Sequence, residues 1–325
     1  MTLHRLATYD KPQDEMNEEV QDMAAAANSI IVDWGTTSLR AALVGEEGEE
    51  LDHLETADGI ASLAKGEHEA ALMAALAPWF SRQGALPVAA LGMITSRNGW
   101  VEVAYVPCPA GPAELAAGTV RRSLPNGSDL VFLPGLNDPA RQPFPDVMRG
   151  EETQIVGHGL GEDATLIIPG THSKWARVKA RRIDGFQTFV TGEIFNLLIN
   201  HSFIARGSTQ PPVDDPEAYL WGLKEAKRSA AMLSLMFSAR TGGLAGRLSP
   251  DQLRSFVRGL VIGQEFRQAR EAGWYAEGDE AAIVGNDGLN DLYLVAAEVF
   301  GLKTSVGADD ALTKGALTVL QHALP

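Results

Sequence analysis

Three things are scarce in this sequence, and each scarcity excludes a class of protein. Cys108 is the one cysteine among 325 residues, so an internal disulfide framework and a cysteine-based zinc site are excluded. Apolar runs are short: none reaches the roughly 18 residues that span a bilayer, and residues 1–23 lack the apolar centre of a signal peptide. We expect a cytoplasmic protein with no membrane partner.

Basic residues are scarce as well, with 27 Lys and Arg against 42 Asp and Glu and a formal charge of −15. This balance argues against a nucleic-acid partner, because phosphate backbones are bound by basic faces. The acid is unevenly placed: residues 1–28 carry six acids and two bases, and residues 46–55 carry six acids and no base. Residues 92–182 hold ten bases and nine acids, so an anionic ligand is expected to bind there.

The familiar nucleotide motifs are missing too. The sequence has no Gly-x-x-x-x-Gly-Lys-[Ser/Thr] segment and no Gly-x-Gly-x-x-Gly after a strand, which argues against a P-loop and a Rossmann site. It does contain apolar strands that alternate with helices in both halves, and this alternation predicts an α/β fold. Residues 1–28 are polar and then alanine-rich, and we predict a disordered extension there. A strand is predicted from Ile30, with helices within 61–84, 191–206, 216–240, 249–273, 289–300 and 309–324.

An internal repeat of a β-turn-β unit divides the chain into two related halves. Gly35-Thr36-Thr37-Ser38 follows one apolar strand, and Gly170-Thr171-His172-Ser173 follows another 135 residues later. Each turn precedes a strand that carries a cation. Both turns predict phosphate binding, because glycine allows close approach and the hydroxyl and N–H groups donate to phosphate oxygens.

Charged residues beside these turns suit the same ligand. Asp33, at the end of the first strand, offers a carboxylate for a hydrated Mg²⁺. Lys174 directly follows the second turn and is expected to face phosphate, whereas His172 either donates to phosphate or bonds to backbone. The competing interpretation is an ordinary hairpin turn after Asp33 and a solvated strand face for Lys174 and Arg177.

A late glycine turn is the candidate nucleoside site. Gly285 and Asn286 follow a buried strand, and bare backbone there lets a base or ribose come close. Gly315 lies within the last predicted helix, where glycine costs about 1 kcal/mol relative to alanine. Close approach of another element or of a ligand would offset that cost.

Six longer segments resemble one protein family. They are DWGTTSLRAAL, GMITSRNGWVEVAYVPCPAG, PDVMRGEETQIVG, PGTHSKW, TGEIFNLL and LVIGQEF. These segments resemble the 2-dehydro-3-deoxygalactonokinase (2-keto-3-deoxygalactonate kinase) family, within the superfamily of sugar kinases, hexokinase, actin and Hsp70. The resemblance runs from about Ile30 to the C-terminus.

The resemblance implies a two-domain, actin-like ATPase (ribonuclease H-like) fold of the α/β class, with ATP in the interdomain cleft. Residues 29–158 with 311–325 would form the N-terminal domain with the substrate loops, and residues 159–310 the C-terminal domain with the adenosine site. The implied activity is ATP- and Mg²⁺-dependent phosphorylation of the 6-hydroxyl of 2-dehydro-3-deoxy-D-galactonate in galactonate or galactose catabolism. Alternatives are a kinase for another acidic or neutral sugar, such as 2-dehydro-3-deoxygluconate, and a non-catalytic sugar-responsive protein. The expected partners are the sugar acid and ATP, and a homodimer is left open.

The resemblance also locates a catalytic base. In related carbohydrate kinases a Gly-Asp-Gln-Gln segment before the second phosphate turn supplies the catalytic aspartate, and Gly150-Glu151-Glu152-Thr153-Gln154 stands at that relative position. Glu151 is therefore the predicted base, with Glu152 and Asp146 as alternatives. The competing interpretation makes Glu151 and Glu152 first-turn acids that stabilise the N-terminus of a helix.

A sugar acid needs a cation for its carboxylate, and the loop around Arg97 offers one. An arginine binds a carboxylate through two parallel hydrogen bonds, and the face of Trp100 suits the apolar side of a sugar. The competing interpretation packs Trp100 into the core, pairs Arg97 with an acid and makes Tyr105 a strand residue. The predicted substrate residues are Ser96, Arg97, Asn98, Trp100, Tyr105 and Arg149.

Two further sites remain from the sequence. Thr191, Gly192 and Glu193 either reach substrate or begin a helix that Glu193 caps. Cys108 stands between two prolines, and nothing nearby lowers the pKa of a thiol. We predict a packed or partly exposed thiol there, not a nucleophile.

Overall fold

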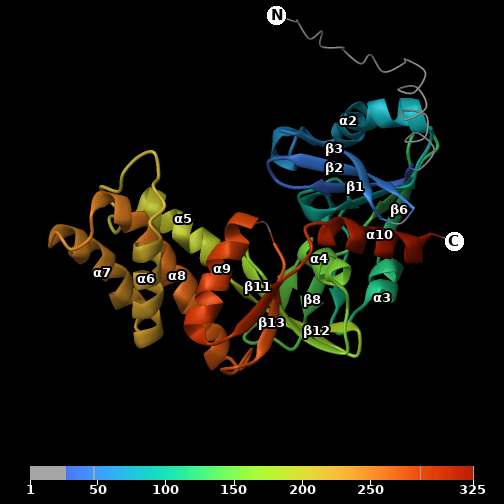
Figure 1. The fold of residues 1–325 in the computed structure, drawn as a ribbon. Helices are drawn as coiled ribbons and strands as arrows, with labels where there is room; N and C mark the ends of the chain where they lie inside the picture. The colour runs from blue at the N-terminus through green and yellow to red at the C-terminus, as the bar shows by residue number, and fades with distance from the viewer. Residues whose placement is uncertain (1–26, 47, 286, 325) are drawn as a thin grey trace, which may run out of the picture. The chain divides into compact units, whose positions relative to one another are not determined.

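The computed structural model describes residues 27–46, 48–285 and 287–324, which divide into two compact units (Figure 1). Unit 1 comprises the described residues through Val103 together with Thr119–Leu133, and unit 2 comprises Ala104–Gly118 with Pro134–Ala323. Of the extension predicted over residues 1–28, residues 1–26 lie outside the described residues, as does the predicted nucleoside residue Asn286. Residues 27 and 28 belong instead to the first strand. In those ranges, no helix is both long and apolar enough to cross a membrane.

A mixed six-stranded sheet forms the framework of unit 1. Its elements are β1 (Ala27–Trp34), β2 (Leu39–Gly45), β3 (Glu50–Thr56), β4 (Val88–Leu91), β6 (Val120–Ser123), β7 (Asp129–Phe132), helix α2 (His68–Gln83) and the 3₁₀ turns η1 (Ile60–Ser62) and η2 (Gly92–Thr95). The strand order is β3-β2-β1-β4-β7-β6. β1 pairs antiparallel with β2 and parallel with β4, and β4 pairs parallel with β7.

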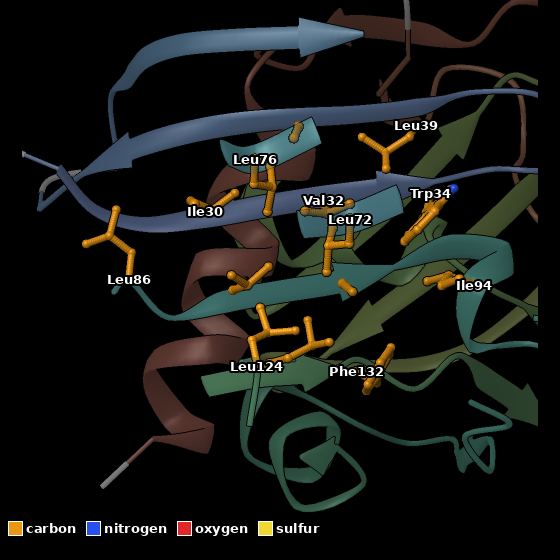
Figure 2. Close-up of a cluster of buried hydrophobic side chains, with 14 of the residues drawn as sticks. Ile30, Val32, Trp34, Leu39, Leu72, Leu76, Leu86, Ile94, Leu124 and Phe132 are labelled. Carbon is orange, nitrogen blue, oxygen red and sulfur yellow. The ribbon is translucent and has the colours of Figure 1, made fainter. Parts of the chain in front are cut away.

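The core of unit 1 lies between this sheet and α2 (Figure 2). Ile30, Val32 and Trp34 alternate along β1 and so point to one face of the sheet, where all three are fully buried. Leu72 and Leu76, one helical turn apart on α2, are fully buried against the same cluster. The helix predicted within residues 61–84 is therefore confirmed, and its apolar stripe covers the strand that precedes the first turn.

Unit 2 repeats the same sheet. Its strands are β10 (Asp163–Ile168), β11 (Ser173–Lys179), β12 (Arg182–Phe189), β13 (Glu280–Ile283) and β14 (Lys303–Val306), in the order β12-β11-β10-β13-β14. β10, β11 and β12 pair antiparallel, whereas β13 pairs parallel with both β10 and β14. In unit 1 the strands β3-β2-β1-β4-β7 follow the same order with the same directions. This match confirms the predicted repeat and the α/β class.

Helices and a small sheet complete unit 2. The helices are α3 (Pro112–Ala117), α4 (Glu151–His158), α5 (Thr191–His201), α6 (Pro216–Arg228), α7 (Met232–Leu244), α8 (Pro250–Glu271), α9 (Asp287–Phe300) and α10 (Ala311–Ala323), and the small sheet pairs β5 (Val106–Pro107), β8 (Leu136–Asp138) and β9 (Asp146–Met148) in that order. α10 lies along α4, and α6 along α8 (Figure 1).

Glycines allow the closest of these helix contacts. A Cβ atom on Gly315 of α10 would lie 1.8 Å from the carbonyl oxygen of Thr153 on α4, and one on Gly157 would lie 1.7 Å from that of Ala311. No side chain fits at such distances. The close approach proposed for Gly315 is therefore confirmed, and its partner is a helix.

Three features differ from the sequence prediction. Residues 50–56 form the edge strand β3, where no strand was predicted, because charged side chains are tolerated on an exposed edge. The predicted helical segment 216–240 is broken between Arg228 and Met232 into α6 and α7. Residues 104–118, residues 134–158 and α10 group with unit 2 and not with unit 1, because α10 packs on α4 and α3. The predicted assignment of functions to the two domains, and the place of ATP relative to them, stay predictions.

Candidate active site

The second predicted phosphate turn lies at the edge of the unit 2 sheet, between β10 and β11. Thr171 and His172 are exposed there, while Ser173 is buried. The turn is backed by the start of α5: a Cβ on Gly192 would lie 2.6 Å from the carbonyl oxygen of Gly170, and the Glu193 N–H donates to the carbonyl of Thr171 at 3.0 Å. Only glycine at residue 192 allows α5 to approach the turn this closely.

A second turn lies directly beside it. Because β10 and β13 are parallel neighbours, the segments that follow them meet at one edge of the sheet. A Cβ on Gly285, after β13, would lie 3.3 Å from the ring of Pro169, after β10. The Asn290 side chain donates to the carbonyl of Gly285 at 2.9 Å and holds this turn at the start of α9.

A cavity of about 310 Å³ opens beside these turns and is lined only by residues of unit 2. The backbone of Gly170 and Thr171 forms one part of its wall. Helices α5, α8 and α9 supply the rest, with apolar side chains and the polar side chains of Thr191, Asn196, Arg258 and Tyr293. Those that bear on the chemistry are Phe195, Asn196, Arg258, Ile262 and Leu292.

The sequence prediction missed these wall residues. They lie on three separate helices, α5, α8 and α9, where each looks like any other core or surface residue. Arg258 is held in place by an ion pair with Asp214 at 2.9 Å and by the ring of Phe195, whose centroid lies 5.1 Å away. No local sequence signal distinguishes Arg258 from the neighbouring arginines of α8.

Lys174 and Glu151 form a partly buried ion pair. The Lys174 Nζ lies 3.0 Å from Glu151 Oε1 and donates to the carbonyl oxygen of His172 at 2.8 Å. The Lys174 side chain is only 4% exposed and that of Glu151 25% exposed. The interpretation of Lys174 as a solvated strand residue is therefore wrong. Arg177, three residues further along β11, instead donates to the carbonyl of Gly273.

His172 also pairs with a carboxylate. Its Nε2 lies 2.6 Å from Glu193 Oε2, and both side chains are about half exposed. One interpretation had this imidazole hydrogen-bonded to backbone, whereas it bonds to a side chain of α5. Glu193 does not cap the helix, because no side-chain cap is present at the start of α5.

The three candidate bases have different surroundings. Glu151 Oε2 accepts from the Arg149 N–H at 3.0 Å, and the carboxylate remains partly exposed beside Lys174. Glu152 is 1% exposed, and both of its oxygens accept from the Gly150 N–H. Asp146 accepts from the N–H and the hydroxyl of Thr188, which ties β9 to β12. Of the three, only Glu151 lies against a cation at the phosphate turn.

Arg149 and Tyr105 lie next to the proposed base. The guanidinium carbon of Arg149 sits 4.3 Å from the centre of the Tyr105 ring. A Cβ on Gly135 would lie 2.8 Å from that ring, so the tyrosine is fixed from its other side. Unit 2 thus joins Tyr105, Arg149 and Glu151 in one continuous set of contacts.

The first predicted phosphate turn is built in the same way in unit 1. Asp33 Oδ2 lies 2.5 Å from Arg40 across the β1–β2 pair. Thr36 and Thr37 are exposed and Ser38 is half-buried. Gly59 packs directly against this turn, since a Cβ atom on Gly59 would lie 2.3 Å from the backbone of Thr37. Gly92, after β4, approaches Asp33 as Gly285 approaches Pro169, so the repeat extends to the glycine beside each turn.

The predicted substrate loop of unit 1 is only partly exposed. Arg97 is 87% exposed and lies 3.8 Å from Glu102. Trp100 packs on the core, stacked against His68 with centroids 6.2 Å apart and edge-on to Phe132 at 5.3 Å. The interpretation that packs Trp100 into the core matches this position. The exposed side chains of the loop are those of Arg97 and Asn98.

Cys108 has the character predicted for it. The side chain is half-buried, and burial together with the Asp138 and Asp184 carboxylates raises the pKa of the thiol to about 12. A raised pKa disfavours the thiolate, which argues against a nucleophilic role.

Burial makes Glu152 a source of pH-dependent stability. Desolvation in α4, reinforced by the charge of Glu151, raises the pKa of Glu152 from 4.5 to about 8. Between these values the folded protein holds a proton that the unfolded chain releases, so the free energy of unfolding falls as pH rises. Between about pH 5.5 and 7.5, Glu152 should lower the free energy of unfolding by roughly 3 kcal/mol. We expect Glu152→Gln to abolish this decrease, as measured by urea denaturation at several pH values.

The exposed Glu162 offers the matched control for this measurement. Glu162→Gln should leave the pH dependence of the wild type intact. An equal slope in Glu152→Gln and in the wild type would contradict the assignment.

The fold is a duplicated α/β sheet in which each copy carries a hydroxyl-bearing turn between its first two strands, and the family model that matches it makes the chain a kinase. The particular family follows from comparison with known proteins. The family model for 2-keto-3-deoxy-galactonokinase matches residues 33–319. The chain belongs to this family.

Relatives of the chain carry the same activity in their names. It is 35% identical over 301 residues to a probable 2-dehydro-3-deoxygalactonokinase of Rhizobium meliloti (strain 1021), covering 90% of this chain and 96% of the relative. It is 31% identical to the 2-dehydro-3-deoxygalactonokinase of Escherichia coli (strain K12), covering 92% and 99%. A crystal structure of a Sinorhizobium meliloti protein assigned the same kinase name superposes with a TM-score of 0.82 at 32% identity, covering 91% of this chain and 99% of that one.

Proposed function

We propose that the chain phosphorylates the 6-hydroxyl of 2-dehydro-3-deoxy-D-galactonate with ATP and Mg²⁺, in galactonate or galactose catabolism. Membership of the kinase family and the names of the two bacterial relatives support this substrate. The observation that carries the proposal is the position of Glu151, a partly exposed carboxylate 3.0 Å from the lysine that follows the phosphate turn. Transfer to a sugar hydroxyl requires a base beside a phosphate-binding group.

The cavity of unit 2 fits the nucleoside of ATP. Apolar walls from Phe195, Ile262 and Leu292 suit the faces of a purine, and Asn196 and Arg258 supply polar groups for its edge or for ribose. The cavity reaches the backbone of Gly170 and Thr171. The phosphates would then lie at the turn, where backbone N–H groups bind anions.

The described residues fit a magnesium ion held mainly by water and phosphate. No group of three His, Cys, Asp or Glu side chains that could cage a metal occurs in the described ranges. Mg²⁺ at phosphate sites commonly uses one or two carboxylates and keeps its waters, and Asp33 would be that carboxylate. When bound, the ion neutralises charge on the phosphates during transfer.

Glu151 would accept the proton in the transfer step. The 6-hydroxyl oxygen forms a bond to the γ-phosphorus, the bond from that phosphorus to the bridging oxygen of ADP breaks, and the hydroxyl proton passes to Glu151. Before the transfer, the Lys174 ammonium pairs with this carboxylate at 3.0 Å. As Glu151 takes the proton, the Lys174 ammonium becomes available to the transferred phosphoryl group.

The substrate class is tested by ADP formation with purified protein over a panel of acceptors. We expect turnover with 2-dehydro-3-deoxygalactonate, with a higher kcat/KM than for 2-dehydro-3-deoxygluconate. No turnover is expected with a neutral hexose. Turnover of the hexose alone would overturn the sugar-acid proposal, and the absence of ADP with every acceptor would favour a non-catalytic sugar-responsive protein.

Arg97 and Arg149 are the proposed partners of the substrate carboxylate, the first on an exposed loop and the second beside Glu151. Loss of a charged hydrogen-bond partner costs about 1.5–3 kcal/mol, so Arg97→Ala and Arg149→Ala should each raise the KM for the sugar acid about 10- to 100-fold. The KM for ATP should change little. Arg121, exposed on β6, provides the control: Arg121→Ala should behave as the wild type. If one of these substitutions leaves the KM for the sugar acid unchanged, that arginine does not bind the substrate carboxylate.

A further inference from the structure

Glu265 of α8 is a buried carboxyl group to which the proposed reaction gives no role. Its side chain is in the core of unit 2, and the residue is 2% exposed. Oε1 accepts from the indole N–H of Trp175 at 2.8 Å. Oε2 accepts from the hydroxyl of Thr191 at 2.5 Å and from that of Tyr293 at 2.6 Å. Burying such a group is costly unless its oxygens are satisfied, and here three donors satisfy them.

These partners come from the elements that form the nucleotide cavity. Thr191 is the first residue of α5, one position before the glycine that contacts the phosphate turn. Tyr293 lies on α9, and both residues line the cavity. Glu265 therefore ties two walls of the cavity to α8, which supplies a third.

One bond links the same network to the phosphate turn itself. The hydroxyl of Tyr293 lies 2.7 Å from that of Ser173, the last residue of the turn. Because the Tyr293 hydroxyl donates to Glu265, its oxygen is left to accept from Ser173. The result is a chain of hydrogen bonds from the turn through Tyr293 to Glu265, in a dry interior where such chains strengthen one another.

Stability alone does not account for this arrangement. Burial raises the pKa of Glu265 and of Tyr293, so both groups are costly to charge where they lie. An apolar contact of similar volume would hold the same helices together without that cost. The directed hydrogen bonds hold the Ser173 hydroxyl and the start of α5 in one position, which an apolar contact would not do.

We propose that Glu265 is a positioning residue for ATP, which acts through Tyr293, Thr191 and Ser173 to hold the phosphate turn in register with the nucleoside cavity. This inference rests on the proposed function, since it takes the turn and the cavity as one nucleotide site. Glu265 does not touch the nucleotide. Its effect is on the geometry of the groups that do.

The sharpest test compares two buried tyrosines of the same core. Tyr293→Phe removes the hydroxyl that joins Ser173 to Glu265. Tyr275→Phe removes a hydroxyl of equal burial class that donates only to the carbonyl of Phe266, at 3.0 Å. We expect Tyr293→Phe to raise both the Kd and the KM for ATP about tenfold, the loss of roughly one hydrogen bond. The KM for the sugar acid should stay within twofold, and Tyr275→Phe should leave the ATP values unchanged.

Two further variants separate positioning from folding. Ser173→Ala should reproduce the ATP defect, and the double variant with Tyr293→Phe should be no worse than either single variant, because both break one chain. Glu265→Gln keeps an acceptor for Trp175 and should retain the melting temperature and most ATP affinity, whereas Glu265→Leu should lose ATP affinity.

ATP binding measured by calorimetry, apart from turnover, decides between the possible failures. If the wild type binds no ATP, the proposed function fails. If the wild type binds ATP and Tyr293→Phe binds it as tightly as Tyr275→Phe, the network is only structural and the inference is overturned.

Discussion

Glu151→Gln is expected to lower kcat by about 10²- to 10⁴-fold, the range lost when a general base is removed. The amide has the shape of the carboxylate and can still accept from the Arg149 N–H, but it cannot take a proton and does not pair with Lys174. Because binding groups stay in place, the KM for ATP and for the sugar acid should change less than threefold, roughly the error of such comparisons. Steady-state kinetics of ADP formation measure all three values.

Matched carboxylates give this prediction its controls. Asp146→Asn should weaken the tie between β9 and β12, and so reduce the melting temperature more than kcat. Glu152→Gln should retain most of kcat, since Glu152 is buried against its own helix start. Wild-type turnover in Glu151→Gln, with loss of turnover in Asp146→Asn, would transfer the base to Asp146.

Gly315→Val is expected to reduce the free energy of unfolding by about 5 kcal/mol or more, which leaves little of the stability of an ordinary domain. Even the first side-chain carbon would lie 1.8 Å from the carbonyl oxygen of Thr153, and the valine adds two methyl groups. α10 would have to move away from α4. Since Thr153 is two residues from Glu151 on α4, any folded fraction should also show reduced kcat.

Gly243 is the matched control for that substitution. It lies within helix α7, and a Cβ atom there would meet nothing within 4 Å. Gly243→Val should therefore change stability by less than about 1 kcal/mol, the scale of helix propensity. Urea denaturation followed by circular dichroism measures both variants. Equal stability of the two would mean that α4 and α10 do not pack as closely as the glycines indicate.

Local patterns were enough to predict much of the fold. The apolar run of β1, the helical spacing of Leu72 and Leu76, and the two glycine-hydroxyl turns depend on residues that are close in the sequence. Strand β3 was missed because its charges resemble those of a loop, and only pairing with β2 makes it a strand. The break between α6 and α7 was missed because alanine and serine at residues 229–231 carry no strong stop signal.

The wall of the cavity shows why the rest could not be predicted. Phe195, Arg258 and Leu292 are separated by more than thirty residues from one another along the chain. Each belongs to a helix whose local pattern is satisfied by many rotations and packings. Their convergence depends on how α5 and α9 pack against α8.

The sequence by itself determined the duplicated β-turn-β units, the chemistry of their turns and the family, because these reside in short contiguous segments. Tertiary structure decided the surroundings of the three candidate bases. Glu151, Glu152 and Asp146 are alike as residues, yet one lies beside Lys174, one is buried and one binds Thr188. Burial and charge partners come from elements distant in the chain, and these set whether a carboxylate can accept a proton.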